Sequence, residues 1–468
     1  MSDALQYQKQ KELFGHPVGL YILFFTEMWE RFSYYGMRAI LVLYLVAEAG
    51  SGNPGLGWTN GDALSLYGTY TMLVYVASIP GGWIADKFLG QKQSVLVGGI
   101  LLVAGHGILS IEQMWAFYTG LGLIIAGVGM LKPNISTMVG GLYKTGDIRR
   151  DKGFTIFYIG INVGAFLSSL IVGYVGEVYG WHYGFGLAAI GMLLGLIQYV
   201  AGQKHLKYVG NNTNNSIDPE EQAAMKRPLS KIEKDRMIVL FISFILVIVF
   251  WGAFEQAGGL MNIYASEKTN RMLMGWEVPA SWFQSLNALF IIVLGTSVAA
   301  YWAHRKLKGK ISTSLFKMCL GLIIMGTGFF FMTGAAAQYN ADGSSAMYWL
   351  VAAYLFHTVG ELCLSPVALS YITKLAPLKY ASLMMGVYFA MTGFGNKVAG
   401  LLGESASDLG EYTVFTGIAI FCVVFGLLVM LIRKKLEKLT HGAEDNEREI
   451  NDDNEPYEIA DPDFNKAN

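Results

Sequence analysis

Twelve apolar runs, each about 20 residues long, occur along the 468-residue sequence. That length is needed for an α-helix to cross the roughly 30 Å hydrocarbon core of a bilayer. Because lipid offers the backbone no hydrogen-bond partner, spanning runs of this kind are expected to be helices. The predicted spans lie at 18–48, 63–85, 94–112, 115–142, 153–176, 183–203, 237–265, 280–303, 313–335, 346–373, 380–402 and 412–433.

The composition agrees with an all-α membrane protein that has the lipid bilayer as its surroundings. Only 15% of the residues are charged and 53% are hydrophobic, whereas a soluble domain averages about 25% charged residues. The first 15 residues are polar and mixed in charge, so we expect no cleavable signal peptide. The net charge of −1 says nothing about partners by itself; we expect the lipid bilayer and small substrates, and no nucleic acid.

The polar stretch at 204–236 divides the spans into six and six. We therefore predict an N-terminal six-helix bundle at 1–203, a cytoplasmic linker at 204–236 and a C-terminal six-helix bundle at 237–435. The remaining residues, 436–468, are rich in Asp and Glu. They are predicted to form a disordered cytoplasmic tail.

Positive charge decides the orientation. Nearly all Lys and Arg residues outside the spans fall in connections on the same side as the N-terminus, and the other side holds only Lys268 and Arg271. This asymmetry predicts that both termini are cytoplasmic. No long outer domain lies between the ninth and tenth spans, and no organelle signal is recognisable, which favours the bacterial inner (cytoplasmic) membrane for this multi-pass protein.

A short motif after the second span narrows the architecture. GGWIADKFLGQK places Gly82, Asp86, Gly90 and Lys92 at the spacing G-x-x-x-D-x-x-x-G-x-K/R. This spacing and position resemble the loop of the major facilitator superfamily. The resemblance implies two six-helix bundles around a central cavity.

Eight ionisable residues lie within the predicted spans. They are four acids and four bases: Glu27, Glu30, Arg31, Arg38, Lys132, Glu255, Glu361 and Lys397. A lone charge at the bilayer centre costs at least about 2.5–3.5 kcal/mol, so such groups pair or face water. We expect them to converge on a cavity, where carboxylates beside fixed positive charges suit a proton relay.

The distribution of these charges suggests the ligand. Glu27, Glu30, Arg31, Tyr34 and Arg38 share one helical stripe. The N-terminal half supplies most of the cations, and the C-terminal half supplies Glu255 and Glu361. A zwitterion would fit, with its carboxylate on the planar fork of an arginine. Polar and aromatic residues near the charges could complete the walls: Tyr34, Tyr35, Tyr75, Asn162, Trp251, Asn287 and Tyr388.

The stretch EMWERFSYYG (27–36) resembles the E-x-x-E-R-F-x-Y-Y-G signature of the proton-dependent oligopeptide transporter family. Further segments agree in order: GVGMLKPNIST (127–137), FYIGINVGA (157–165), FWGAFEQAGG (250–259), WFQSLNALF (282–290) and GELCLSPVALS (360–370). The resemblance covers about residues 18–403. It implies symport of di- and tripeptides with protons, by alternating access.

The resemblance also implies roles for single residues. The proton-coupling residues would be Glu27, Glu30, Arg31, Lys132 and Glu255. The peptide carboxylate would meet Arg31, Lys132, Tyr34 and Asn162, and the amino end would meet Asn287, Glu361 and nearby Ser365. Tyr75, Trp251, Tyr388 and Phe389 would line the side-chain pocket, with Tyr35, Arg38 and Glu255 also in the binding site. Glu267 resembles a member of an extracellular gate ion pair.

Three departures from the family pattern are visible. The interval 204–236 is too short and polar for the two extra helices of many bacterial members. The family's tryptophan on the eleventh span is Tyr388 here, and the histidine of animal members corresponds to Gly68. Coupling is therefore expected to rest on carboxylates, with His106, His182 and His357 structural.

Other functions are left open by the residues. The same fold could carry nitrate or another anion, an amino acid, or a peptide-like drug. A membrane enzyme is disfavoured, because the sequence contains no H-E-x-x-H, no G-x-S-x-G and no P-loop. No metal-ligand spacing is present, so we expect neither metal nor cofactor, with protons as the coupling ion. A scaffold would leave the charges within the spans without a role.

Overall fold

The computed structural model describes residues 10–144, 147, 149–211, 228–377 and 380–443. The long helices are α2 (Val18–Val46), α3 (Asn60–Val76), α5 (Gly90–Leu109), α6 (Met114–Gly141), α7 (Arg149–Val178), α8 (Trp181–Gly202), α10 (Lys231–Phe254), α12 (Ser285–Leu307), α13 (Ser314–Asp342), α14 (Met347–Leu375), α15 (Ala381–Leu409) and α16 (Glu411–Lys438). Shorter helical pieces are α4 (Ser78–Ile84), η1 (Ala85–Leu89), η2 (Gln203–His205), η3 (Glu255–Ala257), α11 (Leu260–Glu267) and η4 (Ala280–Gln284).

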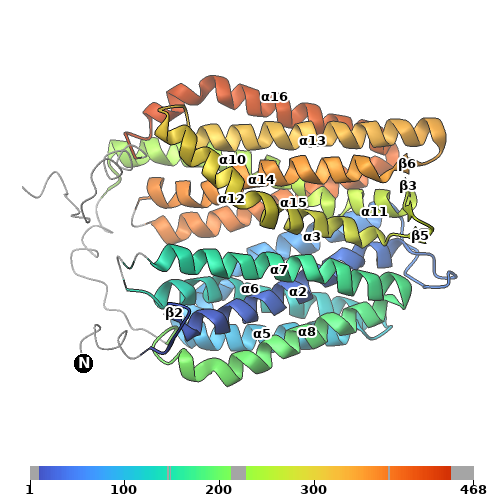
Figure 1. Cartoon of the computed structure of the whole chain (residues 1–468), viewed down its shortest axis with the longest axis horizontal. Helices are drawn as coiled ribbons and strands as arrows, with labels where there is room; N and C mark the ends of the chain where they lie inside the picture. The colour runs from blue at the N-terminus through green and yellow to red at the C-terminus, as the bar shows by residue number, and fades with distance from the viewer. Residues whose placement is uncertain (1–9, 145–146, 148, 212–227, 378–379, 444–468) are drawn as a thin grey trace, which may run out of the picture.

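Three two-stranded ribbons complete the secondary structure of the described residues. Strand β1 (Glu12–Leu13) pairs antiparallel with β2 (His16–Pro17), and β4 (Met272–Leu273) with β5 (Trp276–Glu277). Strand β3 (Thr269–Asn270) pairs in parallel with β6 (Ser345–Ala346). All three lie at the ends of the helices, outside the helical layers (Figure 1).

The helices account for twelve crossings of a membrane. Within the described residues, nine segments combine sufficient length with high hydropathy, and one of them, 60–109, contains two successive helices, α3–α4 and α5. Helices α2 and α15 are each 29 residues long and add two more crossings. Charged residues along α2 and polar ones along α15 lower their hydropathy.

The two halves of the chain form two bundles, seen one above the other in Figure 1. In the N-terminal bundle α2 packs on α7 and α8, and α5 packs on α6 and α8. In the C-terminal bundle α13 packs on α14 and α16. Contacts between α3 and α15 and between α7 and α12 join the bundles.

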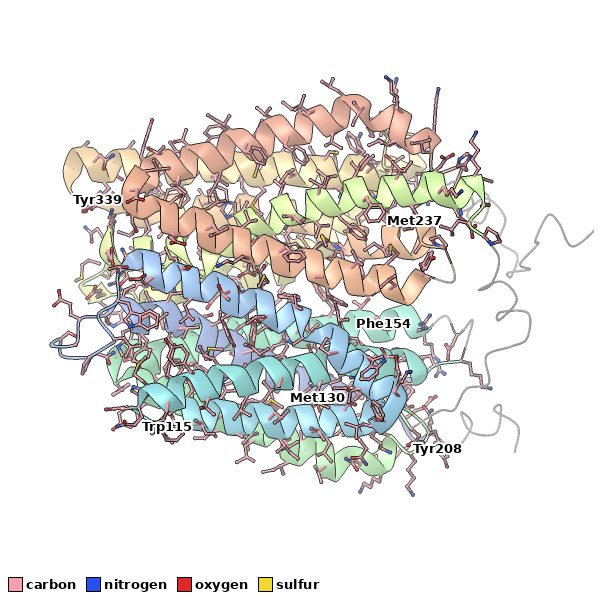
Figure 2. The ribbon with its side chains drawn as sticks, turned by 180° about the vertical axis from the view of Figure 1, so that it is seen from behind. Trp115, Met130, Phe154, Tyr208, Met237 and Tyr339 are labelled. Carbon is pink, nitrogen blue, oxygen red and sulfur yellow. The ribbon has the colours of Figure 1, made fainter. Side chains whose placement is uncertain are left out.

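Large apolar side chains cover the outside of both bundles, as expected for a surface in contact with lipid. On α8 the exposed residues include Ile190, Leu194 and Ile197, and on α16 they include Phe421 and Leu431. Figure 2 shows side chains of this kind along the length of the helices. This is the fold of a multi-pass membrane protein.

Both ends of the described chain lie on one side of the bundles, which we call the terminal side. Helix α2 begins there and α16 ends there, at the left of Figure 1, and β3, β5 and β6 mark the opposite side. In Figure 2 Tyr208 and Met237 lie toward the terminal side, and Trp115 and Tyr339 lie at the opposite side.

The glycine-aspartate motif forms the turn between η1 and α5 on the terminal side. Gly90 has φ of +74°, a left-handed conformation that glycine adopts without steric cost. The backbone N–H of Lys92 donates to the carbonyl of Gly210 at 2.9 Å, and the Tyr199 hydroxyl donates to the Lys92 carbonyl at 3.0 Å. The motif thereby ties the turn to the end of the N-terminal bundle.

The helix boundaries differ from the predicted spans most clearly at α10. It begins at Lys231, inside the stretch predicted as linker. The reason is a capping box: Ser230 Oγ accepts from the N–H of Glu233 at 3.2 Å, and the Glu233 carboxylate accepts from the N–H of Ser230 at 2.8 Å. Residues 212–227 of the predicted linker and 444–468 of the predicted tail lie outside the described residues.

Candidate functional site

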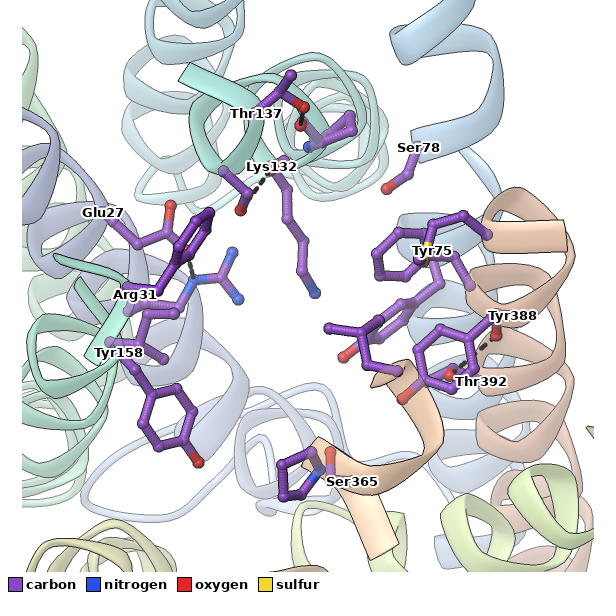
Figure 3. A pocket seen from close by; sticks show the side chains of 18 of the residues that line it. Glu27, Arg31, Tyr75, Ser78, Lys132, Thr137, Tyr158, Ser365, Tyr388 and Thr392 are labelled. Carbon is purple, nitrogen blue, oxygen red and sulfur yellow. Dashed lines mark hydrogen bonds and ion pairs between the residues drawn. The ribbon is translucent and has the colours of Figure 1, made fainter. Parts of the chain in front are cut away.

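A cavity of about 1690 Å³ lies between the two bundles. It runs from the middle of the helices to the terminal side, where Asp86, Gln91, Arg150 and Tyr208 line its mouth. Figure 3 shows its central part, with residues of α2 and α6 on one wall and residues of α14 and α15 facing them.

The α2 wall carries a charged cluster. Arg31 Nε lies 3.0 Å from Glu27 Oε1 and also forms an ion pair with Glu30. The guanidinium lies 5.6 Å from the ring centroids of both Tyr34 and Tyr35. Two carboxylates thus hold one arginine at the cavity wall.

Helical geometry decides which residues of α2 face the cavity. Successive residues are about 100° apart, so a face centred on Arg31 takes in Glu27, Tyr35 and Arg38. Those residues line the cavity. Glu30 and Tyr34 point beside this face and do not line the cavity.

Lys132 projects into the cavity from α6, between Arg31 and Tyr75 (Figure 3). Its ammonium lies 4.1 Å from the centroid of the Tyr75 ring, a cation–π contact. Pro133 follows it within α6 and removes one backbone hydrogen bond of the helix. The cation therefore stands beside a missing backbone hydrogen bond in a helix that is otherwise continuous.

The C-terminal bundle also places a charged side chain near a proline of a membrane helix, in this case a carboxylate. Glu361 of α14 accepts a hydrogen bond from Asn287 Nδ2 at 2.8 Å, and the same amide donates to Thr358 Oγ1 at 3.1 Å. Ser365 lines the cavity one turn further along, directly before Pro366, which lies inside α14. Glu361 has its carboxylate fixed by a neutral donor.

Aromatic side chains from the C-terminal bundle complete the walls. Trp251, Tyr388 and Phe389 line the cavity. The Tyr388 and Phe389 rings lie 5.7 Å apart edge to face. Thr392 Oγ1 donates to the Tyr388 carbonyl at 3.1 Å. These flat surfaces can accept apolar side chains without demanding one hydrogen-bond pattern.

An ion pair between the bundles lies at the inner end of the cavity. Arg38 Nη1 is 2.9 Å and 3.0 Å from the two carboxylate oxygens of Glu255. The Tyr67 hydroxyl donates to the same carboxylate at 3.1 Å, and the Arg38 guanidinium lies 4.8 Å from the Tyr35 ring centroid. The pair joins the N-terminal bundle to the C-terminal bundle.

Polar contacts join the bundles further toward the opposite side. Asn262 Nδ2 donates to the carbonyl of Ala39 at 2.8 Å. Glu267, expected in an ion pair, accepts instead from the neutral amide of Asn60 at 3.2 Å. Between the cavity and the opposite side, the two bundles are therefore joined by these hydrogen bonds as well as by the Arg38–Glu255 pair.

Most residues predicted for the site line this cavity. They are Glu27, Arg31, Tyr35, Arg38, Tyr75, Lys132, Asn162, Trp251, Glu255, Asn287, Glu361, Ser365, Tyr388 and Phe389. Their roles in coupling and binding stay predictions. Glu30 and Tyr34 lie behind the wall, for the geometric reason given above.

The expectation that all eight membrane charges converge on the cavity is too broad. Lys397 of α15 does not line it. Its ammonium donates to Thr69 Oγ1 of α3 at 2.8 Å, so it helps to join α3 and α15. On the same contact, a Cβ at Gly68 would lie 2.7 Å from Gly400 Cα, which leaves no room for a histidine.

The cavity lining also includes residues that were not singled out from the sequence, among them Tyr158, Gln284, Tyr354 and Thr392. Each of these four lies three, four or seven positions from a predicted residue of the same helical segment. Helical periodicity applied to the predicted residues would have found them.

Comparison with known proteins decides the family. The sequence pattern of the POT family matches residues 92–222 and 220–414. The chain belongs to the POT family.

Curated relatives match over nearly their whole length. The chain is 37% identical to "Uncharacterized transporter YclF" of Bacillus subtilis (strain 168), over 92% of this chain and 97% of the relative. It is 34% identical to a "Di-/tripeptide transporter" of Lactococcus lactis subsp. cremoris, over 92% and 98%. It is 33% identical to "Peptide transporter YePEPT" of Yersinia enterocolitica subsp. palearctica serotype O:3 (strain YE-P4), over 93% and 97%.

Solved structures of the family share the fold. A variant of peptide transporter POT in complex with alafosfalin is 36% identical, with a TM-score of 0.85, over 94% of this chain and 99% of that one. A POT family transporter in complex with 5-aminolevulinic acid is 31% identical, with a TM-score of 0.85, over 92% and 99%. The predicted major facilitator superfamily fold is thereby confirmed.

Proposed function

We propose that this POT family protein is a proton-coupled symporter of di- and tripeptides. The observation that carries the proposal is the polarity of the cavity: Arg31 and Lys132 line it from the N-terminal bundle, and Glu361 lines it from α14 of the C-terminal bundle. A short peptide is a zwitterion and would bridge the two walls. The names of the relatives from Lactococcus lactis and Yersinia enterocolitica support the same cargo.

The peptide carboxylate would bind on the Arg31 side, because a guanidinium can donate to both oxygens. The peptide ammonium would bind Glu361, whose carboxylate keeps acceptor capacity beyond its bond from Asn287. The aromatic wall of Trp251 and Tyr388 would accept the peptide side chains.

Coupling would follow from competition for Arg31. Glu27 and Glu30 both form ion pairs with its guanidinium. Protonation of either carboxylate removes one negative partner and frees hydrogen-bonding capacity for the peptide carboxylate. Binding of the proton and the peptide would then favour each other.

Direction would follow from the membrane energetics. With both termini in the cytoplasm, the cavity described here faces the cytoplasm. Each proton that moves inward releases about 2.3 kcal/mol per 100 mV and about 1.4 kcal/mol per pH unit. One pH unit supports roughly tenfold accumulation of peptide per proton, and 100 mV supports about fiftyfold.

The test is uptake of labelled dialanine into proteoliposomes, with and without an inward proton gradient and a negative inside potential. Free alanine, tripeptides and nitrate serve as competitors. We expect uptake driven by the gradient and blocked by short peptides only. The peptide assignment would be refuted if dialanine were not taken up and nitrate or alanine were transported, or if nitrate or alanine blocked the uptake of dialanine.

The proton relay is tested separately with Glu30→Gln. The variant should lose gradient-driven uptake and keep exchange of peptide across the membrane, since the binding walls are intact. Glu112→Gln, at an exposed acid outside the cavity, is the matched control. Gradient-driven uptake that is unaltered in Glu30→Gln would contradict the relay.

A further inference from the structure

At the opposite side of the membrane, a carboxylate of the N-terminal bundle binds the first turn of a helix in the C-terminal bundle. Glu177, in the last turn of α7, accepts from the N–H of Ser281 at 2.8 Å, from Ser281 Oγ at 2.5 Å and from the N–H of Ala280 at 2.9 Å. We call this set of contacts the Glu177 clasp.

The clasp satisfies donors that the helix itself cannot satisfy. Helix η4 continues directly into α12, and together they span 280–307. The first N–H groups of a helix have no partner within it, and Pro279, at the N-cap position, provides no side-chain hydrogen bond. A carboxylate is the strongest acceptor available for such donors. In this protein it comes from the other bundle.

The surrounding residues are fitted to the same contact. A Cβ at Gly173 would lie 2.1 Å from Ser281 Oγ, so only glycine lets α7 approach η4 this closely. Trp282 Nε1 donates to the Leu170 carbonyl at 3.0 Å. Two successive turns of α7 thus contact η4.

A connection of the N-terminal bundle holds the backbone at the end of α7, where Glu177 lies. Asn53 Nδ2 donates to the carbonyls of Gly176 and Glu177 at 2.8 Å and 3.2 Å. The Trp181 indole donates to the Asn53 carbonyl at 3.2 Å. The end of α7 is therefore fixed by contacts within its own bundle, independently of its contacts with the C-terminal bundle.

We infer that Glu177 is a gating residue, whose contact with the first turn of η4 holds the opposite side of the transport path closed while the cavity is open to the terminal side. The inference rests on the alternating access of the proposed function. For the bundles to part at the opposite side, α7 must leave η4. Both backbone donors then lose a charged acceptor, so the clasp stabilises the state seen here.

The experiment measures the opening directly, without transport. Spin labels are placed at Glu112→Cys and Ala341→Cys, exposed positions at the opposite-side ends of the two bundles. The three native cysteines are buried, and a variant without the added cysteines measures their background labelling. Double electron–electron resonance in nanodiscs then reports the distance across that side.

Three substitutions in the clasp and one control test the contact, and one of the three, Glu177→Ala, removes the carboxylate altogether. Glu177→Gln keeps the shape but turns an amide N–H₂ group toward the donors of η4. Ser281→Ala removes only the hydroxyl donor. Glu48→Gln changes an exposed acid of the same side and is the control. Each variant must elute as a single species in size-exclusion chromatography, which shows that it is folded.

Glu177→Gln should raise the ratio of long to short distances about tenfold, because hydrogen bonds to a charged group are lost. Ser281→Ala should give a smaller rise, and Glu48→Gln should give none. Distance distributions that stay unchanged in folded Glu177→Gln and Glu177→Ala would overturn the inference. Failure of peptide uptake alone would refute the proposed cargo and leave this readout intact.

Discussion

The buried ion pair between Arg38 and Glu255 allows a quantitative prediction about stability. The side chains are 11% and 2% exposed, so only a small part of either charged group meets the solvent of the cavity. Removal of one member leaves the other as an uncompensated buried charge, which costs about 3–5 kcal/mol. Glu255→Met also ends the hydrogen bond from Tyr67, worth about 1 kcal/mol.

The double variant Arg38→Met/Glu255→Met should be far less affected than the single variants suggest. Replacement of a buried pair by apolar side chains of similar volume is often neutral or stabilising by about 1–4 kcal/mol. We therefore expect the double variant to be more stable than either single variant.

The assay is reversible unfolding in mixed micelles of increasing SDS content, for the wild type and the three variants. Glu277→Met is the control, because Glu277 also pairs with an arginine, Arg271, but is 62% exposed. It should lose no more than about 1 kcal/mol. Losses in the double variant equal to the sum of the single losses would refute the argument that the charges are coupled.

Three further outcomes are expected. Gly68→Val should destabilise the protein by about 1–3 kcal/mol through overpacking against α15, whereas Gly417→Val, where a Cβ meets nothing within 4 Å, should not; equal unfolding midpoints would contradict this. Glu361→Gln should raise the KM for dialanine roughly tenfold or more but leave inhibition by an N-acetylated dipeptide unchanged, and equal losses would argue against an ammonium site. Because its hydrogen bonds with Arg149 hold the pKa of Asp147 below the usual range, the wild type should be more stable than Asp147→Asn above about pH 3.9, with the difference lost as the pH falls through the lowered pKa. A difference that grows in acid would contradict that sign.

Much of the fold was predictable because the bilayer restricts it. Run length and the position of positive charge locate the spans, and a lone charge in a span implies a partner or a cavity. Local capping was harder to weigh: Ser230 and Glu233 start α10 within a stretch that composition alone assigns to a linker.

The sequence allowed us to predict which residues line the cavity, but not which of them contact one another. Arg38 and Glu255 are 217 positions apart, and nothing in the sequence ties them together. A rotation of about 100° separates Tyr35, which lines the cavity, from Tyr34, which does not. Glu267 was expected to pair with a positively charged residue. Its partner is the neutral amide of Asn60, which a search for opposite charges does not find.

The size of the cavity has a consequence for selectivity. Its volume of about 1690 Å³ corresponds to on the order of fifty water molecules at liquid density. A dipeptide held by its two charged ends would fill only a small part of that space, and mobile solvent would fill the rest. Exchange of one side chain for another then changes mainly how much solvent is displaced. A cavity built in this way tolerates many side chains, and it lets a bound molecule be hydrated from the terminal side as soon as its ends are released.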